Sequence, residues 1–208
     1  MLWSVLLAGC DTTAPIVPVA TLHSNQLPAR ISVALDIRHH SAWTTDRREK
    51  AQAAARVLEA VLNSAQFAQR LENRRDLLHT EGLSAPDILQ LIRAGKTLAN
   101  LRGNANDATG KAITLALSIS PDTSEYAHYD GFTDLGTGII YTKREWFDQQ
   151  TQCRLAGLFA HEHMHVAGFK HASFSHPWRR RSVPYAIGDM VIELAEQSMG
   201  AKCVVSKN

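Results

Sequence analysis

The sequence carries little net charge of either sign, which limits the partners that it is expected to bind. Its 22 Lys and Arg residues nearly balance its 20 Asp and Glu residues, and the formal net charge is +2 at pH 7. Domains that bind nucleic acid usually carry a strongly basic face. The one basic cluster, at 179–181, is either a solvated loop or a surface that faces substrate or membrane. We therefore expect no nucleic-acid partner.

Long apolar runs are also missing from the sequence. No stretch reaches the roughly 20 consecutive apolar residues that a membrane-spanning helix needs. A shorter apolar run fills residues 1–10 and ends in Leu-Ala-Gly-Cys, which resembles the signal of a bacterial lipoprotein. The resemblance implies export, cleavage before Cys10 and a lipid anchor on that cysteine, at the periplasmic side of a membrane in the cell envelope. The alternative is an apolar N-terminus without such a role, since the run is short and no Lys or Arg precedes it.

Cysteine is scarce, and the rest of the chain has the composition of a folded domain. Residues 11–29 are rich in Thr, Pro and Ala without periodicity, so we expect a tether. Residues 30–208 have the usual size of one domain, and a chain that is 45% hydrophobic and 20% charged is not expected to be disordered. With Cys10 lipidated, Cys153 and Cys203 remain as a pair, and an oxidising compartment would permit a disulfide between them without requiring it.

The stretch from His161 to His171 reads HExxHxxGxxH and predicts a metal centre. On a helix, His161 and His165 project from one face and can share one Zn²⁺. Glu162 is turned by about 100° around the helix axis, so it flanks the metal and can accept a proton from a water molecule. Gly168 tolerates a left-handed backbone that ends the helix and lets His171 approach as the third ligand. We therefore predict one Zn²⁺ per chain, bound by three histidines, with Glu162 as the catalytic base.

Other ligands remain open at this point. His176 is an alternative third ligand, and Glu193 or Glu196 could bind the metal from a later helix, as in gluzincin-type sites. His163 points away from the ligands on a helix, so we expect it to contact solvent or a neighbouring element. His128 is expected to be a surface histidine. A purely structural zinc site is disfavoured, because such sites usually have four ligands and are often rich in cysteine.

The motif from His161 to His171 resembles the signature helix of the metzincin clan of zinc peptidases. The segment Ser-Val-Pro-Tyr-Ala-Ile-Gly at 182–188 is similar to the one that follows the histidines in poorly characterised bacterial and phage metallopeptidases. The resemblance implies a metzincin-like, zincin-like fold whose edge strand, within 123–141, binds extended substrate. It also implies that Tyr185 stabilises the oxyanion, although a packed tyrosine is an equal alternative. Met190 is the candidate for the methionine turn of that clan, or else a core residue of a helix.

The hydrophobic patterns predict an α+β fold with a mixed twisted sheet, a long packing helix and the active-site helix. Alternation predicts strands at 31–37 and 113–119, and a last strand at 136–141, followed by Trp146 and Phe147 as core anchors. Helical spacing predicts helices at 46–70, with a capping box of Asp46 and Glu49, and at 84–95, 154–167 and 186–199.

Together these features predict an exported zinc metallopeptidase that hydrolyses a peptide or protein substrate with a water molecule activated by Glu162. One alternative is a zinc amidase that acts on peptidoglycan or another non-protein amide. The other is a non-catalytic zinc-binding lipoprotein, against which Glu162 argues because a structural site needs no base. The sequence carries no prediction of the oligomeric state.

Overall fold

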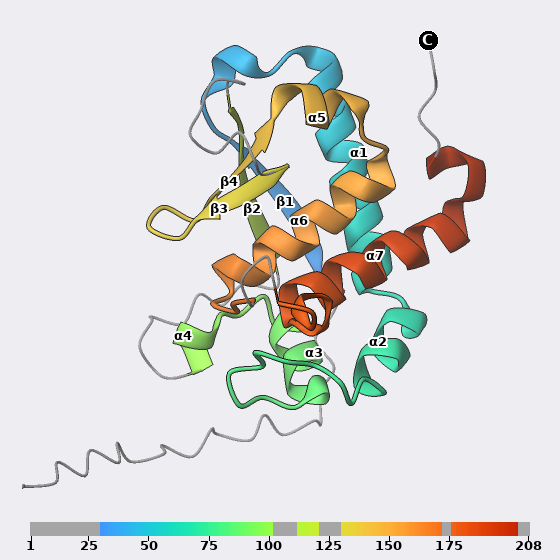
Figure 1. Ribbon diagram of the computed structural model, residues 1–208. Helices are drawn as coiled ribbons and strands as arrows, with labels where there is room; N and C mark the ends of the chain where they lie inside the picture. The colour runs from blue at the N-terminus through green and yellow to red at the C-terminus, as the bar shows by residue number, and fades with distance from the viewer. Residues whose placement is uncertain (1–29, 102–111, 121–129, 172–175, 204–208) are drawn as a thin grey trace, which may run out of the picture.

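The computed structural model describes residues 30–101, 112–120, 130–171 and 176–203, and its fold is α+β as predicted. Its sheet has four strands in the order β1-β2-β4-β3 (Figure 1). β1, β2 and β4 are parallel, and β3 runs antiparallel to β4 at the edge. The sheet is therefore mixed. The strands are β1 (Ser32–Ile37), β2 (Ala112–Ser120), β3 (Gly131–Asp134) and β4 (Ile139–Lys143).

The first two strands lie where the alternating pattern predicted them, and the last begins later. In β2 the alternating apolar residues are buried, and towards the end of the strand Ser118 and Ser120 are buried as well. The predicted strand at 136–141 starts only at Ile139, because the preceding residues form the turn between β3 and β4. There the Asp134 carboxylate accepts hydrogen bonds from the backbone of Gly136 and the hydroxyl of Thr137, and Gly138 has a φ of 70°.

The predicted long helix at 46–70 is wrong, because it is two helices, α1 (Thr45–Leu62) and α2 (Ala65–Glu72). Asn63 ends the first and exchanges hydrogen bonds of 2.9 Å with both backbone groups of Ile31, which fixes the turn against the sheet. Ser64 then caps the second helix. The predicted capping box of Asp46 and Glu49 is also wrong, since Thr44 is the N-cap of α1.

Three short helices follow the predicted pattern in part. α3 (Ala85–Arg93) begins with a capping box formed by Ser84 and Asp87 and confirms the helix predicted at 84–95. α4 (Leu98–Leu101) and α5 (Arg144–Gln149) were not predicted. In α5, Phe147 is a core residue as expected, whereas Trp146 is only partly buried.

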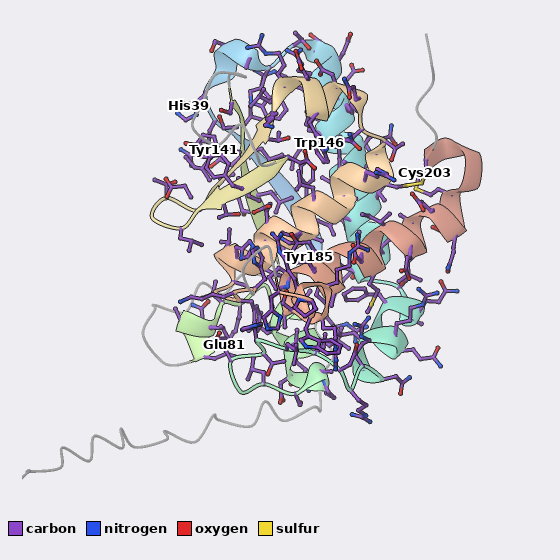
Figure 2. The ribbon with its side chains drawn as sticks, in the orientation of Figure 1. His39, Glu81, Tyr141, Trp146, Tyr185 and Cys203 are labelled. Carbon is purple, nitrogen blue, oxygen red and sulfur yellow. A yellow bond between two sulfur atoms is a disulfide. The ribbon has the colours of Figure 1, made fainter. Side chains whose placement is uncertain are left out.

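Two long helices, α6 (Gln152–Val166) and α7 (Val183–Met199), lie side by side across the molecule (Figure 1). They cross at Gly157 and Gly188, where a Cβ on Gly157 would lie 2.3 Å from Ile192 Cγ1. α1 covers the β1 side of the sheet and α6 the β3 side. Cys153, at the start of α6, forms a disulfide with Cys203, drawn in yellow in Figure 2. The permitted disulfide is therefore present.

Several predictions fall outside the described residues. They concern the lipidation of Cys10, the tether at 11–29 and the surface position of His128. Of the predicted substrate wall at 123–141, the structure describes residues 130–141, which contain β3 and most of its hairpin with β4. None of the helices in the described ranges is long and apolar enough to cross a membrane.

Candidate metal centre

Three histidines meet at the C-terminal end of α6 and can together hold a metal ion. His161 and His165 lie four residues apart on α6, and His171 follows the turn that ends the helix. One nitrogen from each ring can be chosen so that all three lie within 4.8 Å of one another. The ring centroids are 4.9 to 5.7 Å apart. A donor set of three imidazoles suits zinc and other divalent transition metals.

The turn after α6 is what brings the third histidine to the other two. Gly168 has a φ of 103°, in the left-handed region that favours glycine. Its amide donates to the carbonyl of His165, and the amide of Phe169 reaches back to the carbonyl of Met164 at 2.9 Å. This pair of bonds satisfies carbonyls at the helix end. The predicted role of Gly168 is confirmed.

Hydrogen bonds to the backbone orient two of the imidazoles. His165 Nδ1 lies 2.9 Å from the carbonyl oxygen of Phe169, which can only accept, so Nδ1 carries the proton and Nε2 is left as the metal-binding nitrogen. The ring of His161 hydrogen bonds to the carbonyl of Pro184, at the start of α7. Both rings are therefore held before any metal arrives.

Burial keeps these imidazoles in the form that binds metal. Burial, which is the largest cause, lowers the pKa of His161 to about 3 together with the neighbouring rings of His165 and His171 and the guanidinium of Arg179. The pKa of His165 is lowered too, mainly by burial. A neutral imidazole has a nitrogen lone pair for a metal, whereas the protonated ring has none.

Glu162 lies next to the cluster as a buried carboxyl group. Its side chain is on α6, and the residue is 4% exposed. The hydroxyl of Thr133, on β3, is 2.8 Å from Glu162 Oε2 and 3.1 Å from the Glu162 carbonyl oxygen. Burial raises the pKa of Glu162 to about 7, and the hydrogen bond from Thr133 opposes this rise. The group is thus a stronger base than an exposed glutamate.

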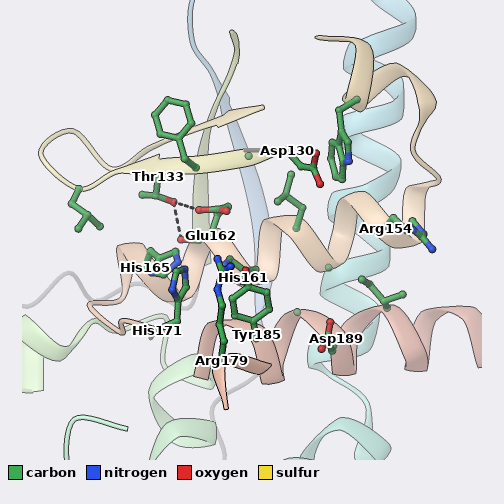
Figure 3. Close-up of a pocket in the computed structure, with 18 residues that line it drawn as sticks. Asp130, Thr133, Arg154, His161, Glu162, His165, His171, Arg179, Tyr185 and Asp189 are labelled. Carbon is green, nitrogen blue, oxygen red and sulfur yellow. Dashed lines mark hydrogen bonds between the residues drawn. The ribbon is translucent and has the colours of Figure 1, made fainter. Parts of the chain in front are cut away.

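The cluster and Glu162 open into one cleft of about 530 Å³ (Figure 3). β3 forms its upper wall in the view and α7 its lower wall, with α6 between them. Trp146, predicted as a core anchor, packs against the core while partly buried and also lines this cleft. The other side chains that line the cleft include Asp130, Phe132, Leu135, Arg154, Leu158, Arg179, Asp189 and Ile192.

Tyr185 lies beside the histidines, on the first turn of α7. Its ring centroid is 4.4 Å from that of His161 and 5.2 Å from that of His171. The ring is partly buried, and burial raises the pKa of its hydroxyl, which keeps the phenol protonated and able to donate. The structure thus places the Tyr185 ring beside two of the histidines, and its role at the oxyanion stays a prediction.

The alternative ligands do not join the cluster. His176 is exposed, and its Nδ1 accepts a hydrogen bond from the amide of Trp178. Glu193 is exposed and pairs with Arg70 at 3.0 Å, and Glu196 is exposed as well. Met190, 4% exposed in the middle of α7, is a helix core residue rather than part of a turn.

His163 is buried, so of the two expected environments it has the neighbouring element and not solvent. It is 8% exposed, and its Nδ1 is buried without a hydrogen-bond partner in the described structure. Burial lowers its pKa from 6.5 to about 4. The folded chain therefore resists protonating this ring, whereas the unfolded chain does not.

We expect this difference to weaken the metal-free protein at acid pH. As pH falls from 6.5 to about 4, His163 becomes protonated in the unfolded chain but stays neutral in the folded chain. The free energy of unfolding therefore falls. The shift corresponds to a loss of about 3 kcal/mol. In His163→Gln, which cannot titrate, the free energy of unfolding measured in urea should fall less over this range. Parallel curves for the two proteins would show that His163 does not contribute.

Comparisons of the chain with models of known protein families, with curated proteins and with solved structures found no match. Two residues of the site were predicted only as parts of longer segments, Thr133 within the substrate wall at 123–141 and Arg179 within the basic cluster at 179–181. Neither belongs to a motif with a fixed spacing from the histidines.

Proposed function

We propose that the chain is a zinc-dependent metallopeptidase with a metzincin-like site. The observation that carries the proposal is the position of Glu162, a buried carboxyl group that lies on the same helix as His161 and His165 and in the same cleft as all three histidines. A structural metal site has no use for a base of this kind. The motif supports the kinship with metzincins, and the antiparallel edge strand β3 above the metal helix is compatible with it.

The side chains of the site have complementary tasks in this proposal. His161, His165 and His171 would hold Zn²⁺, which when bound polarises a carbonyl and lowers the pKa of water to about 7. Glu162 accepts the proton of the attacking water and returns it to the leaving amine. Thr133 holds the carboxylate in place through its hydroxyl. Tyr185 donates a hydrogen bond to the oxyanion of the tetrahedral intermediate.

We propose that this enzyme is exported and lipid-anchored at Cys10. The Leu-Ala-Gly-Cys sequence supports this location. The disulfide between Cys153 and Cys203 also supports it, because disulfides persist in oxidising compartments such as the periplasm.

Metal content and proteolysis, measured together, test the function. Purified wild-type protein should contain one zinc per chain by elemental analysis and should cleave denatured casein in a chelator-sensitive manner. His171→Ala should lose most of the metal at limiting zinc and most of the activity. His176→Ala is a matched control, since this exposed histidine lies outside the cluster.

Each other outcome favours a different function. A protein without bound metal would contradict the proposal at its first step. Zinc with cleavage of muropeptides but not of casein would favour the amidase. Zinc without any hydrolysis would favour the binding lipoprotein.

A further inference from the structure

The three consecutive arginines at the η2 turn (Arg179–Arg181) have different surroundings. Arg181 donates from Nε to the carbonyl of Asp76 at 2.9 Å, and its guanidinium lies over the ring of Trp178. It anchors the turn to the loop after α2. Arg180 has a side chain that is 84% exposed and lies 3.9 Å from Asp189. Neither of these two lines the cleft of the metal centre.

Arg179 is the member of this cluster that lines the metal cleft. Its carbonyl accepts hydrogen bonds from the amide and the hydroxyl of Ser182, which fixes the turn to the start of α7. Its Cζ lies 4.6 Å from the ring centroid of Tyr185. In Figure 3 the side chain rises from the turn beside Tyr185 with its nitrogens toward the histidine cluster. The sequence allowed the basic cluster at 179–181 to be a solvated loop or a surface that faces substrate or membrane. The solvated loop is wrong for Arg179, because its side chain lines the cleft.

With a divalent ion bound, the charges that line the cleft of the metal centre would sum to a small positive excess. The three ligands are neutral imidazoles, so they do not offset the charge of a divalent ion. The cleft is also lined by the acidic side chains of Asp130, Glu162 and Asp189 and by the basic side chains of Arg154 and Arg179. Three negative and two positive charges leave one negative charge, so a divalent ion on the neutral ligands would bring the total to one positive charge. A cleft with an excess of one charge attracts ligands of the other.

We propose that Arg179 binds a carboxylate of the peptide substrate, so that the enzyme prefers peptides with a carboxylate close to the scissile bond. This inference rests on the proposed function. A guanidinium presents five N–H donors in a rigid fork, which matches the two oxygens of a carboxylate and can serve more than one partner at once. The Tyr185 ring limits the motion of the guanidinium, so less entropy is lost on binding.

The carboxylate has two sources in a peptide, the C-terminus and an acidic side chain. Two pairs of dipeptide probes distinguish these two sources. Every probe is joined at its N-terminus to a malonyl hydroxamate that binds the metal. The first pair is leucylglycine with a free C-terminal carboxylate or with an amide. The second pair ends in an amide and carries Glu or Gln in place of Leu. Titration calorimetry on the zinc-loaded protein measures affinity without any turnover.

Wild-type protein should bind the carboxylate member of one pair about 10-fold to 100-fold more tightly than its neutral partner. Arg179→Gln should lose this preference. Arg179→Lys, which keeps the charge but not the fork, should keep a part of it. Arg180→Gln is the matched control on the same turn and should retain all of it, because Arg180 lies outside the cleft.

The outcomes separate this inference from the proposed function. If wild-type protein binds both members of each pair equally, or if Arg179→Gln and Arg179→Lys both keep the full preference, the inference is overturned and the metallopeptidase stands. If no probe binds zinc-loaded wild-type protein, both are overturned. A preference within the first pair identifies the C-terminus as the carboxylate, and one within the second pair identifies a side chain.

Discussion

Replacing Glu162 by Gln is expected to lower kcat/KM for peptide hydrolysis by about 10²-fold to 10⁴-fold, while the zinc content stays at the wild-type level. Glutamine has nearly the same shape and can still receive the hydrogen bond that Thr133 donates to Glu162. It cannot accept a proton from the attacking water. The metal remains bound because the ligands are His161, His165 and His171.

The loss of kcat/KM must be specific to the carboxyl group of Glu162, which a control variant tests. Glu196→Gln removes an exposed carboxyl group on α7 and should leave both zinc and kcat/KM unchanged. Circular dichroism would show whether the two variants keep the fold. Full activity in a zinc-loaded Glu162→Gln protein would exclude Glu162 as the base and remove the observation on which the proposed function depends.

The metal cluster was predictable because its geometry is local. The spacing of His161 and His165 on one helix fixes their common face, and Gly168 fixes the turn that brings in His171. No contact with a distant part of the chain was needed for this prediction.

The contacts of the cluster with the rest of the fold could not be derived from spacing, because they join distant segments, and Tyr185 was expected at the site only through the resemblance to metzincins. Thr133 reaches Glu162 only because β3 packs against α6. Tyr185 reaches His161 because α6 and α7 cross closely at Gly157 and Gly188, where a larger side chain would collide with the other helix. A glycine within a helical pattern does not indicate which other helix packs against it.

The helix break at Asn63 shows the same limit in the fold. The apolar spacing continues through this position, since α1 and α2 both bury apolar side chains against the core. At the end of α1 the Asn63 side chain accepts a hydrogen bond from the Ile31 amide and donates one to the Ile31 carbonyl, directly before β1. The hydrophobic periodicity indicates which face of a segment is buried. It does not indicate where a contact with a distant segment ends the helix.

Removing the disulfide is expected to cause the largest loss of stability. Cys153 and Cys203 are 50 residues apart, and the link limits the freedom of the unfolded chain. For a loop of this length the entropic model gives about 4 kcal/mol. Both cysteines are buried, so the bond also holds the C-terminal η3 turn (Gly200–Cys203) against the start of α6. Cys203→Ala should lower the free energy of unfolding in urea by about this amount.

Reduction provides the control for this substitution. A reductant should bring wild-type protein close to Cys203→Ala and leave the variant unchanged, which separates the loss of the bond from the loss of the side chain. Because Cys153 lies at the opposite end of α6 from the metal ligands, both proteins should still bind one zinc under native conditions. Equal stability of wild-type protein with and without reductant would mean that the bond does not contribute. Loss of zinc on reduction would mean that α6 depends on its first turn to keep the metal centre.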